Sequence, residues 1–414
     1  MSQPATHTQL AIHGGAPYRT IPFPKRTPFG EEEIALTTEA ILSQNLFGPS
    51  GEKVAAFEQA FANFYGVNHA VASTSGTAAI HVAIGALNPN PGDEIITGPI
   101  TDAGSIIPIV YQGCIPIFAD IDDTYMMDPA DVERKITDRT AAILVIHLFG
   151  NASNMDELSK IARRHSIPLI EDCSQAHALK YKGRYLGTWG DIGAFSLQQS
   201  KHMTTGDGGM TITNRADWAE RMSLFCDKGW TRKPGYGARS YAFLAPNYRM
   251  TELQGAVGLA QIKKVRGVVE KRMELGHYLS ALIGEVEGVT PAPVTPEAEH
   301  GYWLYALRVQ GWPVQPFAEA LTKEGVGAGA GYIGEPIYRC MDALMGKKTF
   351  GDSGYPFDGS HGGRQIEYTT GLCPRAETAL HQMVTIGLNE NYSKSDIEDI
   401  AGAIRKVAER LPKA

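Results

Sequence analysis

The sequence has few cysteines, no basic excess and no long apolar run. Its five cysteines (Cys114, Cys173, Cys226, Cys340 and Cys373) form no C-x-x-C pair. This spacing argues against a disulfide framework or a structural zinc site and favours a reducing, cytoplasmic location. The N-terminal residues lack the basic segment and apolar core of a signal peptide, and no apolar run is long enough to cross a bilayer. The formal net charge of −7 argues against a nucleic-acid or anionic-membrane partner.

Two further kinds of site have little support in the sequence. None of the 12 histidines stands in an H-E-x-x-H or comparable ligand spacing, so no metal is indicated. His147 ends an apolar run and is more typical of a core histidine than of a site residue. The glycine-rich stretch 325–331 has Ala330 where a dinucleotide loop needs its third glycine, so we interpret it as a turn.

Strand-like apolar runs alternate with helical patterns between about residues 31 and 260. The predicted strands span residues 69–73, 94–97, 115–119, 141–147 and 167–171, with helices such as 76–87 and 155–165 between them. Because these strands are apolar throughout, they predict a mostly parallel sheet covered on both faces.

A proline-rich break at 288–296 divides the chain. A long helical pattern over 251–283 precedes it, a strand is predicted at 302–309, and the chain ends in an amphipathic helix over 393–411. We therefore expect an N-terminal arm (1–30), a large domain (31–288) and a small domain (289–414). The segment 341–367, rich in Gly, Asp and Ser, predicts a long surface loop.

A lysine follows a predicted strand in an uncharged stretch, residues 194–201. Burial of Lys201 there would lower its pKa and make its amine nucleophilic toward an aldehyde. Ser196 and Ser200 could bind a phosphate. The glycines of 204–209 would turn the chain back sharply, although a plain hairpin has the same composition.

Two other strand ends carry polar residues, and ligands collect at the carboxyl ends of parallel strands. At 73–77, the N–H groups of Gly76, Thr77 and Ala78 would open a helix and suit a phosphate, although Ser and Thr are also ordinary helix caps. At 167–172, Asp172 could keep the nitrogen of a pyridine ring protonated, with a turn or helix cap as the alternative. Gln175 could reach the ring hydroxyl.

Taken together, these motifs resemble a known family. The runs SGTAAIHVAIGAL, IPLIEDCSQAHAL, GAFSLQQSKHMTTGDGG and NYRMTELQGAVGLAQI are similar to those of DegT/DnrJ-type aminotransferases, over nearly the whole chain. The resemblance implies the fold-type I architecture of pyridoxal 5'-phosphate (PLP) enzymes. That architecture is α/β, with a mostly parallel, seven-stranded type of sheet flanked by helices in the large domain and a smaller α+β C-terminal domain. It also implies amino transfer from L-glutamate or L-glutamine to a keto-sugar or a keto-cyclitol such as scyllo-inosose.

The resemblance implies roles for particular residues. Lys201 would carry PLP as an internal aldimine and move the proton, and Asp172 would contact the pyridine nitrogen. Gln175 would lie near the ring hydroxyl, with Gly76, Thr77 and Ser196 near the phosphate.

The resemblance also implies a homodimer with shared active sites. In the family, an Asn in an N-Y-R-M run reaches the phosphate of the neighbouring subunit, and here that residue is Asn247. The candidate substrate contacts are His202, Arg249, Tyr332 and Tyr338.

Two positions distinguish this chain within the family pattern. One branch of the family has His in place of the lysine and carries out a dehydration, so Lys201 favours amino transfer. Where the family has an aromatic residue stacked on the cofactor ring, this chain has Asp102, in the run Thr-Asp-Ala-Gly. An aspartate cannot stack, so either a neighbour such as Ile100 covers the ring or the register differs there. Asp102 could instead face the substrate.

Two alternative functions stay open at the level of sequence. A PLP-dependent lyase or aldolase of the same fold would cleave its substrate without a stable aminated cofactor. A non-catalytic regulator that binds PLP or a sugar would take up the cofactor without amino transfer. No helix-turn-helix pattern or basic patch supports a DNA-binding role.

Overall fold

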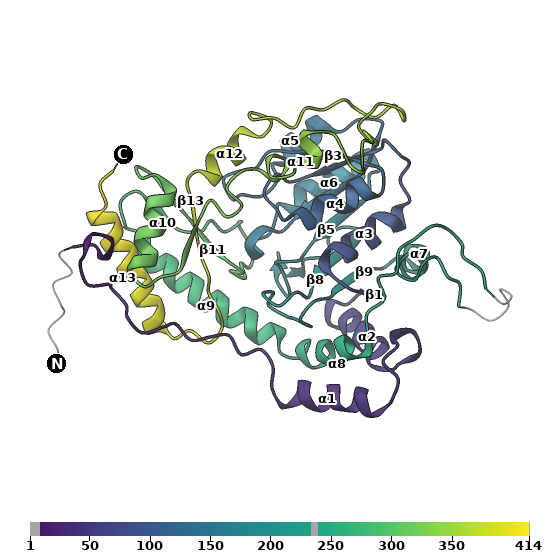
Figure 1. Ribbon diagram of the computed structural model, residues 1–414, viewed down its shortest axis with the longest axis horizontal. Helices are drawn as coiled ribbons and strands as arrows, with labels where there is room; N and C mark the ends of the chain where they lie inside the picture. Colours follow the sequence, from purple (N-terminus) through teal and green to yellow (C-terminus); the bar gives the residue numbers. More distant parts are fainter. Residues whose placement is uncertain (1–8, 233–238, 414) are drawn as a thin grey trace.

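The computed structural model describes residues 9–232 and 239–413, which form a seven-stranded sheet, a four-stranded sheet, a two-stranded hairpin and their covering helices (Figure 1). The larger sheet has seven strands in the order β1-β9-β8-β5-β4-β2-β3. In this sheet β9 alone runs opposite to the other strands, so its pairings with β1 and β8 are antiparallel and the rest are parallel. The strands are β1 (His69–Ser73), β2 (Glu94–Thr97), β3 (Ile115–Phe118), β4 (Thr140–Ile146), β5 (Leu169–Asp172), β8 (Ile192–Ser196) and β9 (Gly209–Thr213).

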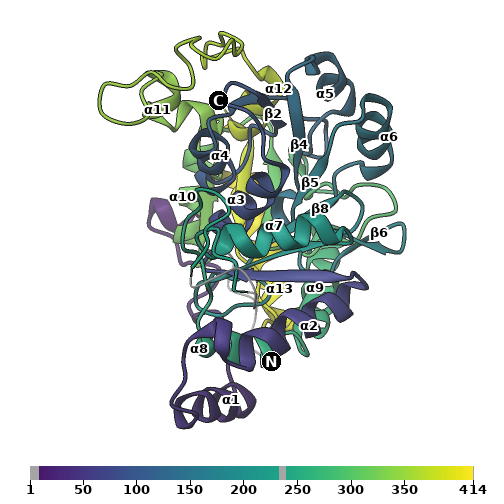
Figure 2. The same cartoon turned by 90° about the vertical axis from the view of Figure 1, so that its right-hand side faces the viewer.

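Helices cover both faces of this sheet (Figure 2). The helices α3 (Gly76–Leu87) and α4 (Ala103–Tyr111) lie on one face, and α5 (Pro129–Lys135) and α6 (Met155–His165) lie on the other. Every residue of β2, β3, β5, β8 and β9 is therefore buried. This burial explains why the strands are apolar throughout, and it confirms the predicted α/β fold with a mostly parallel sheet.

Further helices pack on or beyond β1, and the last of them extends away from β1 to the second hydrophobic core. They are α1 (Glu31–Leu42), α2 (Lys53–Tyr65), α7 (Ala216–Cys226), α8 (Glu252–Gln261) and α9 (Val265–Ile283). The pattern over 251–283 predicts one helical stretch, but the structure has two helices, α8 and α9. Gln261 and Lys264 flank the break, and both donate hydrogen bonds to the Glu33 carboxylate of α1, at 2.7 and 2.6 Å. The break thus lets side chains from two helices reach one buried acid.

The smaller sheet is antiparallel, with the order β10-β11-β13-β12. Its strands are β10 (Val289–Thr290), β11 (Tyr305–Val309), β12 (Ala328–Ala330) and β13 (Met383–Ile386). It packs with α10 (Val314–Lys323), α13 (Lys394–Arg410) and the C-terminal part of α9 around a second hydrophobic core. Leu10 of the N-terminal arm joins this core. Ser393 caps α13 and shares a capping box with Asp396.

One segment after the predicted boundary at residue 288 packs against the large sheet. It contains η4 (Ile337–Arg339), α11 (Asp342–Met345) and α12 (Pro374–Leu380), and residues 346–373 between the last two helices have no regular structure. Tyr368 donates to the carbonyl of Pro116 at 2.9 Å, and the N–H of Arg375 donates to Asp120 at 2.9 Å. The residues after 288 are therefore divided between the two cores, and the domain boundary stays a prediction.

The remaining elements are short. They are the hairpin β6 (Lys180–Tyr181) and β7 (Arg184–Tyr185), and the turns η1 (Ala11–His13), η2 (Gly48–Ser50) and η3 (Leu148–Gly150). Within the described ranges, no helix has both the length and the apolar character that a membrane crossing requires.

Candidate active site

A cavity of about 420 Å³ lies at the carboxyl ends of β5 and β8 and the N-terminus of α3. It is lined by residues from the segments 75–80, 101–105, 172–175 and 196–207, together with Trp303 and Tyr332. Six residues predicted to bind the cofactor therefore share one cavity with the candidate substrate contact Tyr332: Gly76, Thr77, Asp172, Gln175, Ser196 and Lys201. The carboxyl-end location is the usual ligand position in parallel α/β sheets.

Lys201 lies in the loop after β8, with its backbone N–H bonded to the carbonyl of Gln198 at 2.9 Å. Its Nζ lies 3.9 Å from the centre of the Trp303 ring. Burial lowers the pKa of Lys201 to about 8, although the negative charges of Asp172 and Asp102 act in the opposite direction. At pH 7 about a tenth of the amine is therefore uncharged and nucleophilic, and this fraction rises with pH.

Asp172 is the last residue of β5, and its carboxylate is held from two sides. Ser105 Oγ donates to Oδ2 at 2.7 Å, and the N–H of Ser174 donates to Oδ1 at 2.9 Å. Thr101 shares a hydrogen bond with Ser105, with their hydroxyl oxygens 2.8 Å apart. This chain of hydroxyl groups fixes the orientation of a buried anion that lines the cavity.

The start of α3 combines a cap with a close approach of the backbone. Ser75 Oγ accepts from the N–H of Ala78 at 3.0 Å, so that N–H is not free for a phosphate, contrary to the prediction. The N–H groups of Gly76 and Thr77 belong to the first turn, where a helix offers no acceptor. A Cβ added to Gly76 would lie 2.5 Å from the Cβ of Ser196, so only glycine fits beside that serine.

Gln175 and Tyr332 form a polar pair on the cavity wall. Gln175 Oε1 accepts from the N–H of Phe149 at 2.6 Å, and its Nε2 donates to Tyr332 Oη at 3.3 Å. Burial raises the pKa of Tyr332 to about 12, so its phenol is protonated at neutral pH and can donate to a ligand. The amide and the phenol are thus fixed relative to each other.

Asp102 lines the cavity as the N-cap of α4, with Oδ1 accepting from the N–H of Gly104 at 2.8 Å. A cap explains why an aspartate suits this position, where the family has an aromatic residue. Ile100 is buried in the core of the large sheet and does not line the cavity. The aromatic side chains on the cavity wall are Trp303 and Tyr332.

Two candidate substrate residues lie in the core instead of the cavity. His202 is buried, and its Nε2 bonds to the carbonyl of Gly301 at 2.9 Å. Tyr338 is fully buried, accepts from the N–H of Cys373 at 3.2 Å and donates to Glu377 at 3.1 Å. Because residues 337–380 pack against the large sheet, Tyr338 serves that contact, and neither residue lines the 420 Å³ cavity.

Asn247 and Arg249 do not line the active-site cavity of the chain to which they belong. Arg249 pairs with Asp227, and its guanidinium carbon is 5.2 Å from the centre of the Phe47 ring. Arg249 lines a separate cavity of about 650 Å³. Asn247 is exposed next to it and forms an isolated backbone bridge with Asp227.

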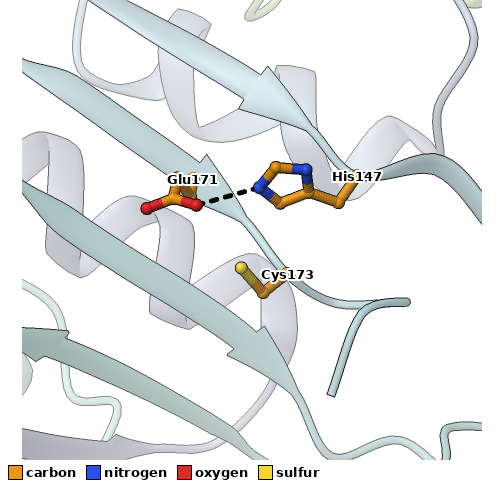
Figure 3. Close-up of side chains that lie close together, drawn as sticks. All are labelled: His147, Glu171 and Cys173. Carbon is orange, nitrogen blue, oxygen red and sulfur yellow. Dashed lines mark hydrogen bonds and ion pairs between the residues drawn. The ribbon is translucent and has the colours of Figure 1, made fainter. Parts of the chain in front are cut away.

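His147 belongs to a buried cluster with Glu171 and Cys173 (Figure 3). Its Nε2 lies 3.0 Å from Glu171 Oε2, and the N–H of Ser153 donates to its Nδ1 at 3.2 Å. Since Nδ1 accepts, Nε2 carries the proton and donates to the carboxylate. Glu171 also accepts from the N–H groups of Gly187 and Gly190, at 2.8 and 2.7 Å.

The third member of this cluster is Cys173, whose thiol pKa is raised well above its ordinary value by burial. One ligand atom from each of the three residues lies within 4.8 Å of the others, a spacing that could surround a metal ion. The ring nitrogens of His147 and both oxygens of Glu171 nevertheless already have protein partners. His147 is therefore a satisfied core histidine, as its sequence position suggests.

Trp303 and Ser105 are site residues that the sequence analysis did not identify. Trp303 precedes β11 in the small-domain segment and reaches the lysine loop, where its Nε1 donates to the carbonyl of Ser200 at 3.0 Å. Ser105 lies on α4, one turn after Thr101. No local pattern marks either residue, because each meets the site only through tertiary packing.

Comparisons with known proteins are consistent with this geometry. The sequence profile of the DegT/DnrJ/EryC1/StrS aminotransferase family matches residues 28–345. A putative L-glutamine:3-amino-2,3-dideoxy-scyllo-inosose aminotransferase from Micromonospora echinospora is 32% identical over 414 residues, covering 97% of this chain and 98% of that protein. A GDP-perosamine synthase from Caulobacter vibrioides is 37% identical over 261 residues, covering 63% and 70%. The solved aminotransferase from Psychrobacter cryohalolentis superposes with a TM-score of 0.81 at 27% identity, covering 92% and 98%.

Proposed function

Because this chain belongs to the DegT/DnrJ/EryC1/StrS aminotransferase family, we propose that it moves an amino group from L-glutamine or L-glutamate to a keto-sugar or keto-cyclitol. The observation that carries the proposal is the shared cavity of Lys201 and Asp172, one a lysine with a pKa lowered to about 8 and the other a fixed, buried carboxylate. Such pairs of perturbed and oriented groups are typical of catalytic sites.

The residues of the cavity fit pyridoxal 5'-phosphate. Gly76, Thr77 and Ser196 would hold the phosphate, since the glycine leaves the space that a Cβ would fill and the helix start offers N–H donors. Asp172 would contact the ring nitrogen and Gln175 the ring hydroxyl. When bound, PLP supplies an aldehyde for the Lys201 amine and an electron-withdrawing ring.

The protein side chains then have separate tasks. Lys201 Nζ, partly uncharged at neutral pH, would take a proton from the α-carbon of the donor and would give a proton to the acceptor carbon that receives the amino group. Such positioned proton transfer contributes about 10²–10⁴-fold to rate. Asp172 stays oriented by Ser105 and Ser174 throughout. Trp303 covers the amine and limits the access of water to it.

The polar side chains of the cavity suit a neutral polyhydroxylated acceptor. Asp102 offers a carboxylate acceptor and Tyr332 a phenol donor, a pair that can bind neighbouring hydroxyl groups of a sugar or cyclitol ring. Scyllo-inosose is one such ketone. L-glutamine is supported as the donor because a relative of full length bears that donor in its name.

A homodimer with shared active sites forms part of the proposal. Five exposed apolar side chains extend from α1 into the segment after it: Ile34, Ile41, Leu42, Leu46 and Phe47. Phe47 also contacts Arg249, two residues from the exposed Asn247. A second subunit docked on this surface would cover the apolar side chains and could receive Asn247 near its phosphate site. The cytoplasmic location stays a prediction from the sequence.

The direct test is the absorption spectrum of the PLP-loaded protein before and after addition of L-glutamine or L-glutamate. The proposal expects the long-wavelength band of lysine-bound cofactor to give way to the shorter-wavelength band of the aminated cofactor. A band that neither donor changes would contradict amino transfer. Loss of the acceptor by carbon–carbon cleavage would favour the lyase alternative, and PLP binding without turnover would favour the regulator.

A further inference from the structure

Arg26 connects the N-terminal arm to the loop that carries Lys201. The residue lies between η1 and α1, in a part of the arm without regular structure. Its Nη1 donates to the carbonyls of Gln199 and Lys201, at 3.1 and 2.6 Å, and its Nη2 donates to the carbonyl of His202 at 2.8 Å. One guanidinium thus bonds three carbonyl groups at and around the lysine.

The other edge of the same guanidinium is anchored to the C-terminal part of the chain. Arg26 Nε donates to Glu390 Oε1 at 2.8 Å, and Glu390 Oε2 lies 2.9 Å from Nη2 of the buried Arg272 in α9. Glu390 belongs to the turn between β13 and α13. The Asn391 side chain in this turn also donates to the carbonyl of Lys25, at 2.8 Å. The arm therefore lies between the small-domain turn and the lysine loop.

The lysine loop, residues 197–208, forms no helix or strand, so individual bonds such as those from Arg26, Trp303 and Gly301 hold it in place. Within the loop, the Lys201 backbone has one N–H bond, to Gln198, and its carbonyl is held by Arg26. The Arg26 side chain is only 14% exposed, so its charge-assisted bonds are largely shielded from water. Releasing them would free the backbone from which the Lys201 side chain extends.

We propose that Arg26 is a positioning residue for Lys201, which holds the backbone of residues 199–202 so that the amine enters the cavity beside Asp172. The inference rests on the proposed function, in which Lys201 carries the cofactor. It goes further in assigning the N-terminal arm a part in preparing the site, although the described arm residues, 9–30, contribute no side chain to the cavity lining. Arg26 contacts neither the cavity nor Asp172, so it acts only through the loop.

The test compares Arg26→Gln with the matched control Arg19→Gln. Arg19 belongs to the same arm and pairs with Asp396 and Asp399 of α13, at 2.7 and 2.6 Å, without contacting the lysine loop. Two quantities are measured: amide hydrogen exchange of residues 198–202 in the cofactor-free protein, and the rate of covalent attachment of PLP to Lys201. For Arg26→Gln we expect faster amide exchange and an attachment rate about one tenth of the wild-type rate. Arg19→Gln is expected to lower Tm while changing neither quantity.

Two conservative variants keep the test decisive if Arg26→Gln does not fold. Arg26→Lys keeps the charge but cannot span three carbonyls, so a partial loss of attachment rate is expected. Glu390→Gln leaves Arg26 in place and weakens the ion pair that anchors it. We expect a smaller rise in amide exchange and a smaller fall in the attachment rate than for Arg26→Gln. Equal behaviour of Arg26→Gln and Arg19→Gln, or unchanged exchange in all Arg26 and Glu390 variants, would overturn the inference. If wild-type protein attached no PLP at Lys201, the proposed function would fail, while the exchange measurement would still test the role of Arg26.

Discussion

The amine of Lys201 lies 3.9 Å from the centre of the Trp303 ring, so residues from the two parts of the chain meet at the reactive group. The lysine follows β8 of the large sheet, and the tryptophan precedes β11 of the small one. Their contact joins the two sheets at the cavity. It also contributes to the burial that lowers the pKa of Lys201 to about 8.

Replacing Lys201 should abolish activity and stabilise the cofactor-free protein. Burial disfavours the charged amine, so the folded-state pKa of about 8 lies below the ordinary lysine value of 10.5. At pH 7 the amine is mostly protonated in both states, so the folded state bears most of the cost of burying the charge; above pH 10.5 the amine is neutral in both. Lys201→Met should therefore raise the free energy of unfolding by ~1–3 kcal/mol at pH 7, with the gain disappearing as pH rises from 8 to 10.5. Urea unfolding at several pH values measures this, and a variant that is less stable at pH 7 would contradict it.

Removing the charge of Asp102 should lower the Lys201 pKa further. The carboxylate of Asp102 favours the protonated amine, and Asn keeps the N-cap of α4 while removing the charge. In Asp102→Asn, the pH dependence of PLP attachment should therefore shift to lower pH. Asp207→Asn is the control, since Asp207 lines the same cavity but does not contribute to the shift. A shift to higher pH, or equal shifts in the two variants, would count against this geometry.

Gly76→Ala should weaken binding of PLP. The new Cβ would lie 2.5 Å from the Cβ of Ser196, and the strain of moving one element away should cost about tenfold or more in affinity. Gly267→Ala in α9 is the control, because nothing lies within 4 Å of its added Cβ. Equilibrium titration with PLP gives both dissociation constants. Adding Ser196→Gly to Gly76→Ala should recover part of the loss, and wild-type affinity in Gly76→Ala alone would refute the proposed phosphate site.

A charge on the exposed face of α1 should disrupt the proposed dimer. Leu42 is 72% exposed, and Leu42→Glu would place a carboxylate in an interface that must exclude water. Light scattering should then show a monomer that has lost most of its activity, because Asn247 could no longer reach a neighbouring site. Met345→Glu in α11, on the opposite side of the molecule (Figure 1), should leave both properties unchanged. An active monomeric wild type would refute shared active sites.

Much of the fold could be predicted because its strands and helices have strong local patterns. The predicted strand at 69–73 and helix at 76–87 match β1 and α3 to the residue. The break between α8 and α9 could not be predicted, since it depends on bonds to Glu33, more than two hundred residues earlier in the chain. The return of residues 337–380 to the large sheet escaped prediction for the same reason. That return is why Tyr338 lies in the core.

The site could be predicted where its residues follow strand ends in sequence. The motifs around Gly76, Asp172 and Lys201 each end or follow a strand of one parallel sheet, and such ends meet at one edge. Trp303, Ser105 and Arg26 carry no comparable signal, because packing between distant segments brings them to the lysine loop. The roles assigned to individual residues stay predictions for the experiments above.

The most direct test of amino transfer follows an isotopically labelled α-amino nitrogen from L-glutamine in the presence of PLP and scyllo-inosose or a panel of keto-sugars. Mass spectrometry of the products detects where the label goes, with Lys201→Ala as the matched control. The proposed function predicts a labelled amine on a ring ketone with wild-type protein and none with the variant. Label that stays on glutamine while PLP is bound, or labelled product at an equal rate with Lys201→Ala, would contradict it.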